Sequence, residues 1–497
     1  TTSSDALPGD ARADLFIDGE AVPPSTGRYG TVVDPSTGRP VGRVAVGGPE
    51  DANRAVEAAD RASEGWGSTP GHERARLLRA LAGRLQGDLE AIARIISTEV
   101  GKPIVDARIE VERASGVFHL AADEVRHLGG ESFPADAYAM PPGNEHRFLF
   151  TVRDPIGVVV AIGPFNFPLN LLSHKVAPAL AAGNPVVAKP TSSAPFTALK
   201  LAEHARAVGL PRGVLNIVLG PGGAVGNSLV EHPATRLVTF TGSTEVGKGI
   251  AERASRHAKR LILEMGGLDP FIVLEDAPME LAVAHAVRGA FTYAGQVCTA
   301  SKRIVVAESI AVEFAKRFAA RVAALKVGPA LEESTQVGPV IDAAALDRLD
   351  GLVQDATERH AKVLTGGGRI EGSGGTFYRP TVLDEVPSDA RVAQEEPFGP
   401  VSPILRFRGD EEAIRIANGT SYGLQASVYT NDLRRAFSIA RRIRAGGVHI
   451  NDPTTLRWDA LPFGGVKESG LGREGVRYAM EEMTEVKLIS VNFDPTA

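Results

Sequence analysis

The sequence predicts an α/β protein with at least two domains, and three observations support this prediction. The chain has 497 residues, which is more than one hydrophobic core normally holds. Between residues 157 and 263, short apolar runs alternate with helical segments. Continuous apolar strands separated by helices are typical of a parallel sheet with both faces covered. A second alternating block of this kind begins at residue 269.

The elements of the first block follow one another in a regular order. The predicted strands are residues 157–163, 185–188, 214–219, 236–240 and 259–263. The predicted helices between them are residues 169–182, 196–208, 225–231 and 245–255. Before this block, residues 49–128 have the apolar spacing of helices, and residues 1–13 are polar and expected to fray.

The second block carries fewer clear signals. Its predicted strands lie near residues 271–274, 303–306 and 428–430. Residues 485–492 form a strand with no later segment to pair with, so its partner is either an earlier segment or another subunit.

Composition excludes several classes of protein. The net charge of −6 gives no overall basic surface for nucleic acid. The apolar runs are strand-sized, shorter than the roughly 18 residues that a membrane span requires. One cysteine cannot form an intrachain disulfide, and the first residues do not resemble a signal peptide. We therefore expect a cytoplasmic protein with no nucleic-acid or membrane partner and no metal site.

The single cysteine, Cys298, lies in the segment AGQVCTAS. Gly295 ends the preceding helix, which places the thiol on a turn with polar neighbours. A lone cysteine is more often a small buried residue than a nucleophile, so both interpretations remain open from the residues alone. Glu264 closes an apolar strand before two glycines, and it could be a structural acid or a general base.

Two strand ends suggest a nucleotide site. Gly242 and Gly247 open a helix after the strand at 236–240, where backbone N–H groups could approach a phosphate. Lys189 ends another strand, and open α/β sheets bind ligands beyond their carboxyl edge. Each feature also has a purely structural explanation, and the GxGxxG fingerprint is absent after the first strand.

Several segments resemble the aldehyde dehydrogenase family over residues 15–492. No single motif is specific, but all occur in the family's order and spacing. The motifs are PFNFP (164–168), KP (189–190), FTGSTEVG (240–247), EMGG (264–267), GQVC (295–298), EEPFGP (395–400) and PFGGVKESGLGRE (462–474).

The resemblance implies a mechanism. Cys298 would attack the aldehyde carbon, and the Asn166 amide with the Cys298 N–H would hold the oxyanion. After hydride transfer, Glu264 would activate water to hydrolyse the thioester. Lys175 and Glu474 match positions that help to relay the proton.

The resemblance also implies an NAD or NADP cofactor. Lys189 would contact the adenosine ribose, Ser243 the pyrophosphate, and Glu396 the nicotinamide ribose, with Phe398 against the nicotinamide. The remaining cofactor residues carried over are Ile162, Phe165, Gly242, Gly247 and Met265. Where NAD-preferring members carry glutamate, this chain has Ser192, so a 2′-phosphate would meet no repelling charge, and NADP acceptance is expected.

The substrate is expected to be a small polar or anionic aldehyde, as in the phosphonoacetaldehyde, lactaldehyde and sulfolactaldehyde branch. Arg108 and Arg457 are the candidates to bind an anion, because a guanidinium suits phosphonate, sulfonate and carboxylate alike. Arg108 could instead pair with Glu112, and Arg457 could be a surface residue. Phe167 stands in the oxyanion motif, where at least one phosphonate-using relative carries histidine.

The resemblance also implies an architecture. It is a Rossmann-like cofactor domain (1–128 and 147–265), a catalytic α/β domain (266–483) and a small β bridging element (129–146 and 484–497). The last strand would extend a neighbouring subunit's sheet, so a homodimer or homotetramer is expected. The alternatives are a CoA-acylating dehydrogenase, an alkyl aldehyde dehydrogenase without anion selectivity, and a catalytically silent protein with this fold.

Overall fold

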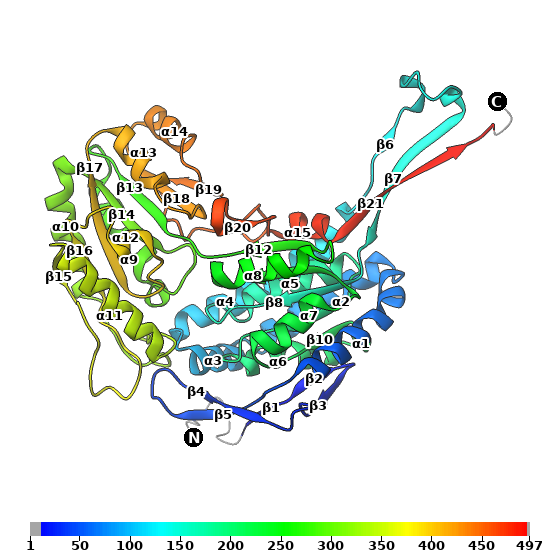
Figure 1. Ribbon diagram of the computed structural model, residues 1–497, viewed down its shortest axis with the longest axis horizontal. Helices are drawn as coiled ribbons and strands as arrows, with labels where there is room; N and C mark the ends of the chain where they lie inside the picture. Colours follow the sequence, from blue (N-terminus) through cyan, green and yellow to red (C-terminus); the bar gives the residue numbers. More distant parts are fainter. Residues whose placement is uncertain (1–10, 495–497) are drawn as a thin grey trace.

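The computed structural model describes residues 11–494. Figure 1 shows two α/β lobes side by side, an arm of three strands that projects from them, and a small sheet near the N-terminus. The expectation that residues 1–13 fray lies mostly outside the described residues; Arg12–Ala13 form strand β1. Strand β1 joins β4 (Tyr29–Val33) and β5 (Pro40–Ala45) in the small sheet.

The first lobe is built on an eight-stranded sheet in the order β20-β12-β11-β8-β9-β10-β2-β3. Its five central strands are parallel, as predicted, and every predicted strand and helix of the first block is confirmed within two residues at each end. The strands are β2 (Leu15–Ile17), β3 (Glu20–Val22), β8 (Val158–Ile162), β9 (Val186–Lys189), β10 (Leu215–Ile217), β11 (Thr235–Thr241), β12 (Arg260–Glu264) and β20 (Gly470–Leu471).

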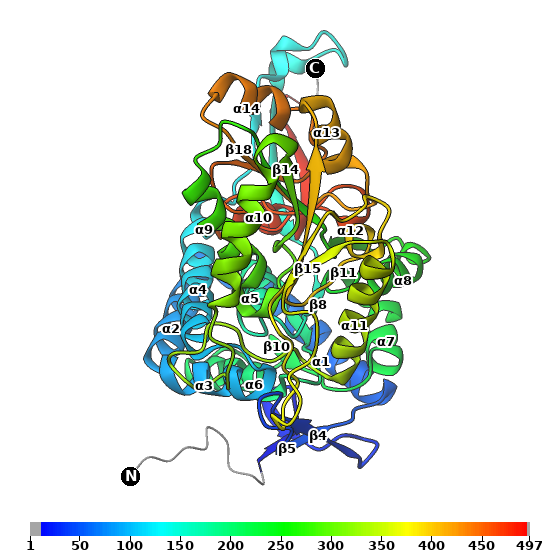
Figure 2. The same cartoon turned by 90° about the vertical axis from the view of Figure 1, so that its left-hand side faces the viewer.

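Helices cover both faces of this sheet. Figure 2 shows α2, α3 and α4 on one side and α7 and α8 on the other. The helices of the first lobe are α1 (Pro49–Gly67), α2 (Gly71–Gly87), α3 (Leu89–Val100), α4 (Ile104–Glu124), α5 (Asn170–Ala181), α6 (Pro195–Ala207), α7 (Asn227–Glu231) and α8 (Thr244–Ser255).

The second lobe has its own core and a seven-stranded sheet in the order β15-β16-β17-β14-β13-β18-β19. All neighbouring strands are parallel except β15 and β16. The strands are β13 (Asp269–Val273), β14 (Ser301–Ala307), β15 (Lys362–Thr365), β16 (Thr381–Asp384), β17 (Val401–Phe407), β18 (Gln425–Tyr429) and β19 (Gly447–Ile450). The helices are α9 (Met279–Phe291), α10 (Glu308–Ala323), α11 (Ala343–Glu358), α12 (Arg391–Gln394), α13 (Asp410–Asn418) and α14 (Leu433–Ala440).

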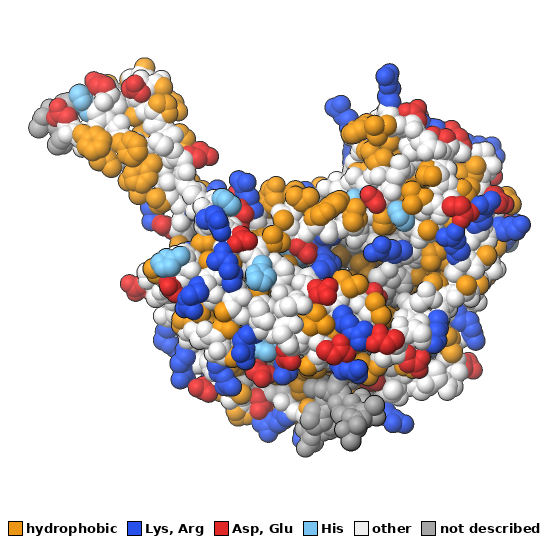
Figure 3. Space-filling model, turned by 180° about the vertical axis from the view of Figure 1, so that it is seen from behind, with side chains coloured by type: hydrophobic (Ala, Val, Ile, Leu, Met, Phe, Trp, Pro, Cys, Tyr) orange, Lys and Arg blue, Asp and Glu red, His pale blue; other side chains and the backbone are white. Residues whose placement is uncertain are grey.

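The C-terminal strand finds its partner within the chain. Strand β21 (Thr484–Asn492) pairs antiparallel along the whole of β7 (Arg147–Pro155), and β6 (Ser132–Phe133) completes the arm. The segment 147–155 was not predicted as a strand, because its charged residues and proline interrupt the apolar pattern. Figure 3 shows apolar side chains gathered on this arm.

The domain boundaries differ from the predicted ones in two places. Strand β7 belongs to the arm, although residues from 147 onward were assigned to the cofactor domain. Helix α15 (Val476–Glu482) packs on α4 and α5, and its Val476, Ala479 and Met480 join the core of the first lobe. Residues 470–483 therefore belong with the first lobe, because their apolar face is covered there. No helix within residues 11–494 is long and apolar enough to cross a bilayer.

A buried ion pair fixes the start of α5, the helix that follows the PFNFP segment. The Glu110 carboxylate accepts hydrogen bonds from the backbone N–H groups of Leu169 (2.9 Å) and Asn170 (3.1 Å). These groups have no partner within the helix, so Glu110 caps it from the neighbouring α4. The Lys102 ammonium pairs with the same carboxylate, and both side chains are fully buried.

Replacing Lys102 tests this buried pair. We expect Lys102→Met to lower the free energy of unfolding by about 3–5 kcal/mol, because it leaves the Glu110 charge buried without its counterion. The double variant Lys102→Met/Glu110→Gln should recover part of that loss, since a neutral amide can still accept the backbone hydrogen bonds. Urea unfolding followed by circular dichroism measures both. Lys362→Met is the matched control, because its Glu385 partner is exposed and the loss should stay below about 1 kcal/mol. A wild-type midpoint for Lys102→Met would contradict the assignment.

Candidate active site

A cleft of about 1090 Å³ lies where the carboxyl ends of the first lobe's strands face the second lobe. It brings together most of the predicted cofactor and catalytic residues. Those that line it are Ile162, Phe165, Asn166, Lys189, Ser192, Gly242, Ser243, Met265, Cys298, Glu396 and Phe398. Gly247 is not among the lining residues; a Cβ there would lie 2.3 Å from the Met265 sulfur, so this glycine serves helix packing.

The lining fits a dinucleotide. Lys189 is buried, and among the described residues its ammonium has no carboxylate partner; its hydrogen-bond acceptor is the Pro190 carbonyl at 3.5 Å. Burial lowers the pKa of Lys189 to about 8. A buried cation of this kind is suited to a ribose hydroxyl or a phosphate. Ser243 caps α8 by accepting from the Val246 N–H, so the positive end of that helix also faces the cleft.

A strained turn presents the nucleophile candidate. Helix α9 ends at Phe291, and Tyr293, Ala294 and Gly295 all have positive φ angles of 48°, 53° and 69°. Left-handed conformations are unfavourable for tyrosine and alanine, and they persist only where the surroundings impose them. A Cβ on Gly295 would lie 2.4 Å from the Gly399 carbonyl oxygen, so only glycine fits there. The prediction of a turn around Cys298 is confirmed.

The PFNFP segment contacts this turn directly. The Asn166 amide donates to the Gln296 carbonyl at 2.9 Å, two residues before Cys298. The Gln296 side chain in turn accepts from the Ile341 N–H at 2.9 Å and donates to the Pro339 carbonyl at 3.2 Å. The structure thus places the predicted oxyanion donor beside the predicted nucleophile.

Cys298 has a poorly solvated environment in which two cations and two acids act on the thiol. The thiol is partly exposed to the cleft. Burial raises the pKa of the Cys298 thiol to about 12, while Lys302 and Arg457 oppose this rise and Glu396 and Asp269 add to it. The thiolate therefore needs further stabilisation before it forms readily near neutral pH.

Glu264 is the most isolated acid of the site. It is 3% exposed, and neither carboxylate oxygen has a hydrogen-bond partner in the described residues. Burial, with the negative charge of Glu474, raises the pKa of Glu264 well above its usual value. A carboxylate that is poorly stabilised as an anion accepts a proton readily, as a general base must.

Lys175 and Glu474 meet at the floor of the same region. Lys175 donates to Glu474 Oε1 at 2.7 Å, and Arg457 pairs with Glu474 Oε2 at 3.0 Å. Burial alone would raise the pKa of Glu474, but the two cations lower it. The Arg457 side chain is only 9% exposed and lies 3.8 Å from the centroid of the Phe463 ring, so it is not a freely solvated surface residue.

A second polar cluster adjoins Arg457 and was not predicted. Asp459 accepts from Arg113 at 2.6 and 3.1 Å and contacts His174 Nε2 at 3.0 Å. His174 is buried, and burial lowers its pKa, which favours the neutral imidazole. We call Arg113, His174, Asp459 and Arg457 the recognition cluster. The segment R-W-D at 457–459, three residues before PFGG, was the only sequence signal that could have pointed to it.

Arg108 is not brought to this site. Its guanidinium donates to Glu90 and Glu333, at distances from 2.6 to 3.1 Å, and it does not pair with Glu112. Arg113, five residues later on α4, pairs instead with Asp459 of the recognition cluster. Phe167 packs edge-on against Tyr293, with the Lys102 ammonium 3.5 Å from its ring centroid.

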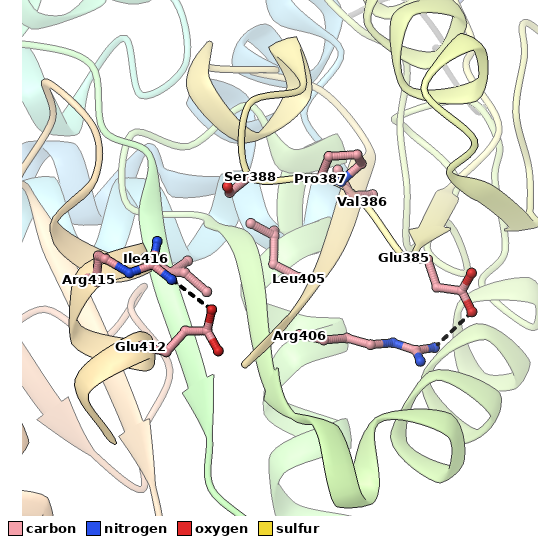
Figure 4. A pocket seen from close by; sticks show the side chains of 9 residues that line it. All are labelled: Glu385, Val386, Pro387, Ser388, Leu405, Arg406, Glu412, Arg415 and Ile416. Atoms are coloured by element: carbon pink, nitrogen blue, oxygen red, sulfur yellow. Dashed lines mark hydrogen bonds and ion pairs between the residues drawn. The ribbon is translucent and has the colours of Figure 1, made fainter. Parts of the chain in front are cut away.

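Other hollows lie apart from these residues. Figure 4 shows a pocket of about 260 Å³ on the second lobe, where Arg415 pairs with Glu412 and Arg406 with Glu385. None of the predicted site residues lines it. Within residues 11–494, no three His, Cys, Asp or Glu side chains are grouped as metal ligands would be.

Comparison with known proteins identifies the family to which these residues and this cleft belong. The aldehyde dehydrogenase family model matches residues 22–489. Among characterised relatives, the glutarate-semialdehyde dehydrogenase of Pseudomonas putida is 38% identical (97% of this chain, 98% of the relative). The lactaldehyde dehydrogenase of Methanocaldococcus jannaschii is 40% identical (96% and 100%). The 3-sulfolactaldehyde dehydrogenase of Priestia megaterium is 40% identical (96% and 98%).

Solved structures also match this chain over nearly its whole length. An NADP-dependent enzyme of Escherichia coli superposes with a TM-score of 0.94 at 36% identity (99% of both chains). The betaine aldehyde dehydrogenase of Staphylococcus aureus, in complex with NAD⁺, gives 0.94 at 34% identity (98% and 96%).

The two-lobed fold and the cofactor cleft define an NAD(P)-dependent oxidoreductase that acts on the aldehyde group. The chain belongs to the aldehyde dehydrogenase family.

Alkylation of the single thiol tests its environment. In cofactor-free protein we expect the rate of reaction with iodoacetamide to rise about tenfold per pH unit from pH 7 to 10 without a plateau, because burial raises the pKa of Cys298 to about 12. Urea-unfolded protein is the control and should level off near the ordinary thiol pKa of about 8.5. A plateau below pH 9 in the folded protein would contradict this expectation.

Proposed function

We propose that this enzyme oxidises a small aldehyde with a polar or anionic substituent to the carboxylic acid. The proposal rests chiefly on one observation, the hydrogen bond that holds Asn166 against the turn of Cys298, with both residues lining the cofactor cleft. Glu264 directly precedes Met265, which lines the same cleft. The recognition cluster adjoins the same region and gives the substrate site its polar character.

The residues divide the chemistry as follows. The Cys298 thiolate adds to the aldehyde carbon, and the Asn166 amide and the Cys298 N–H stabilise the resulting oxyanion. When bound, NAD(P)⁺ supplies the hydride acceptor that turns this adduct into a thioester. Glu264 takes a proton from water, the hydroxide adds to the thioester, and the acid leaves as the thiolate is restored. Lys175 and Glu474 then pass the proton onward.

Glu264 also distinguishes the proposed hydrolysis from a CoA-acylating enzyme and from a catalytically silent protein. In a CoA-acylating enzyme the acceptor is a thiol, and no general base for water is needed at this position. A buried, unpaired carboxylate with a raised pKa is costly, and water activation explains its presence. A catalytically silent protein would have no use for it. Released acid rather than an acyl-CoA is therefore the expected product.

The recognition cluster favours a polar substrate over a plain alkyl aldehyde. Arg457 has a buried Nε, and His174 a buried Nδ1, that lack hydrogen-bond partners in the described structure. Buried polar nitrogens of this kind, a donor on Arg457 and a ring nitrogen on His174, are costly unless a ligand satisfies them. The relatives named for glutarate semialdehyde, lactaldehyde and 3-sulfolactaldehyde act on substrates that carry a carboxylate, a hydroxyl and a sulfonate.

The arm supports assembly into a homo-oligomer. Strand β21 is an edge strand, and Val486 and Leu488 on it are 59% and 61% exposed. Met140 and Phe493, both 73% exposed, extend this apolar surface. An exposed apolar edge is normally covered by another chain, and a second copy of the same arm is the simplest partner.

A panel of aldehydes tests the substrate proposal. We expect Arg113→Met to raise KM for carboxylate-, sulfonate- and phosphonate-bearing aldehydes at least tenfold relative to alkyl aldehydes of equal length, about 1.4 kcal/mol, because Asp459 would then repel the anion. Arg457→Met should act in the same direction. Arg108→Met, on the same helix but outside the cluster, should leave the ratio within twofold. Equal changes across the panel would show that neither arginine selects anions.

Ser192 tests cofactor preference. It lines the cleft and carries no charge to repel a 2′-phosphate. We expect the wild type to use NADP, and Ser192→Glu to lower kcat/KM for NADP at least tenfold while leaving NAD within threefold. Ser192→Gln is the matched control, since it adds the same bulk without charge. A wild-type preference for NAD above about 100-fold, or roughly 2.7 kcal/mol, would contradict the proposal.

A further inference from the structure

Lys302 is a buried cation that the mechanism above leaves unused. It follows the nucleophile by four residues, at the start of β14, and is 4% exposed. Its ammonium donates to the Cys298 carbonyl oxygen at 2.5 Å and pairs with Glu396 Oε1 at 2.8 Å. It also lies 6.0 Å from the centroid of the Phe398 ring. One side chain therefore joins the nucleophile turn to the segment expected to hold the nicotinamide ribose.

The Glu396 carboxylate is held from the protein side only. Its Oε1 accepts from Lys302 and, at 3.3 Å, from the Gly267 N–H, and its Oε2 lies against Gly266. The side chain lines the cofactor cleft and is 16% exposed. A ribose hydroxyl that donates to this carboxylate must share it with Lys302.

Sharing of the Glu396 carboxylate between Lys302 and a ribose would change the balance of charge around the Cys298 thiol. Four charged groups act on Cys298: Lys302 from β14, Arg457 from the segment before PFGG, Glu396 from the 395–400 segment, and Asp269 from β13. The two cations favour the thiolate and the two acids disfavour it. In the protein without cofactor, Glu396 offsets the charge of Lys302, its direct partner.

We propose that Lys302 is a positioning residue that couples occupancy of the nicotinamide-ribose site to the reactivity of Cys298. When ribose hydroxyls bind Glu396, the carboxylate is withdrawn from Lys302, and the ammonium charge then stabilises the neighbouring thiolate. The thiol proton passes to solvent, and the cysteine becomes nucleophilic once the cofactor is in place. This inference rests on the proposed role of Glu396.

Nucleotide fragments separate ribose binding from the nicotinamide charge. ADP-ribose carries the second ribose without the positively charged ring, and ADP lacks both. Each is used at saturation, also as its 2′-phosphorylated form, with binding measured by calorimetry. Because Cys298 is the only cysteine, iodoacetamide uptake reports this thiol alone. We expect ADP-ribose to speed alkylation at pH 7.5 at least fivefold over ADP, and to move the pH profile to lower pH.

Variants test whether the acceleration of Cys298 alkylation by ADP-ribose depends on Lys302. In Lys302→Met the acceleration should fall below 1.5-fold although ADP-ribose still binds, and Lys302→Arg should restore at least half of it. Glu396→Gln should react faster than wild type without nucleotide, and ADP-ribose should add nothing, because Lys302 has already lost its counterion. A merely structural role would not move these two variants in opposite directions. Lys362→Met, which breaks an exposed Lys–Glu pair, is the matched control and should behave as wild type.

The experiment distinguishes failure of the coupling from failure of the cofactor role and of the substrate proposal. Acceleration that persists in Lys302→Met, or equal rates with bound ADP and bound ADP-ribose in wild type, would overturn the coupling. If neither nucleotide binds, the cofactor role of Glu396 and the coupling both fail. Aldehyde turnover is assayed separately, so a protein that binds ADP-ribose and shows the coupling but oxidises no aldehyde would overturn the substrate proposal alone.

Discussion

The hydrogen bond from Asn166 to the Gln296 carbonyl is the contact on which the site depends. It joins the end of the first lobe's β8 segment to the turn that carries Cys298, and these segments belong to different sheets. The turn is held in left-handed conformations that tyrosine and alanine do not adopt unaided. The Gln296 side chain ties the turn to residues 339–341 through hydrogen bonds with the Ile341 N–H and the Pro339 carbonyl. On the other side, the Tyr293 hydroxyl donates to the Val100 carbonyl at 2.8 Å. The nucleophile is therefore positioned by both lobes.

Buried charge gives the site its chemistry, and much of it is arranged in pairs. Lys175 with Glu474, Arg113 with Asp459, and Lys302 with Glu396 each satisfy one another. Glu264 has no hydrogen-bond partner at either carboxylate oxygen among the described residues. Pairing keeps the cations ionised in a region poor in water, while the unpaired acid is free to change its protonation state. The contrast between paired and unpaired acids supports the proposed role of Glu264 as the general base.

Much of this could be predicted from the sequence, for identifiable reasons. Apolar runs such as 158–162 and 186–189 reveal buried parallel strands because both faces of the sheet are covered. The ordered motifs pointed to Cys298, Asn166 and most of the cofactor candidates through resemblance, and these residues line one cleft. Arg113 and Asp459 escaped prediction because they lie more than three hundred residues apart, and no local pattern shows that they meet. Arg108 was chosen because its helix lines the substrate entrance in the family, and the sequence does not show that its guanidinium pairs with Glu90 and Glu333. Strand β7 was missed because its pairing with β21 is a tertiary contact.

The path of the chain after Glu474 connects the arm directly to the polar groups of the site. Only α15 and its short connections separate Glu474, the partner of Lys175, from the first residue of β21. The same stretch is anchored at one end in the polar floor of the site and at the other in a ribbon that projects from the body of the molecule. Any shift of the ribbon would therefore reach Glu474, whose charge acts on Glu264, through only about two helical turns.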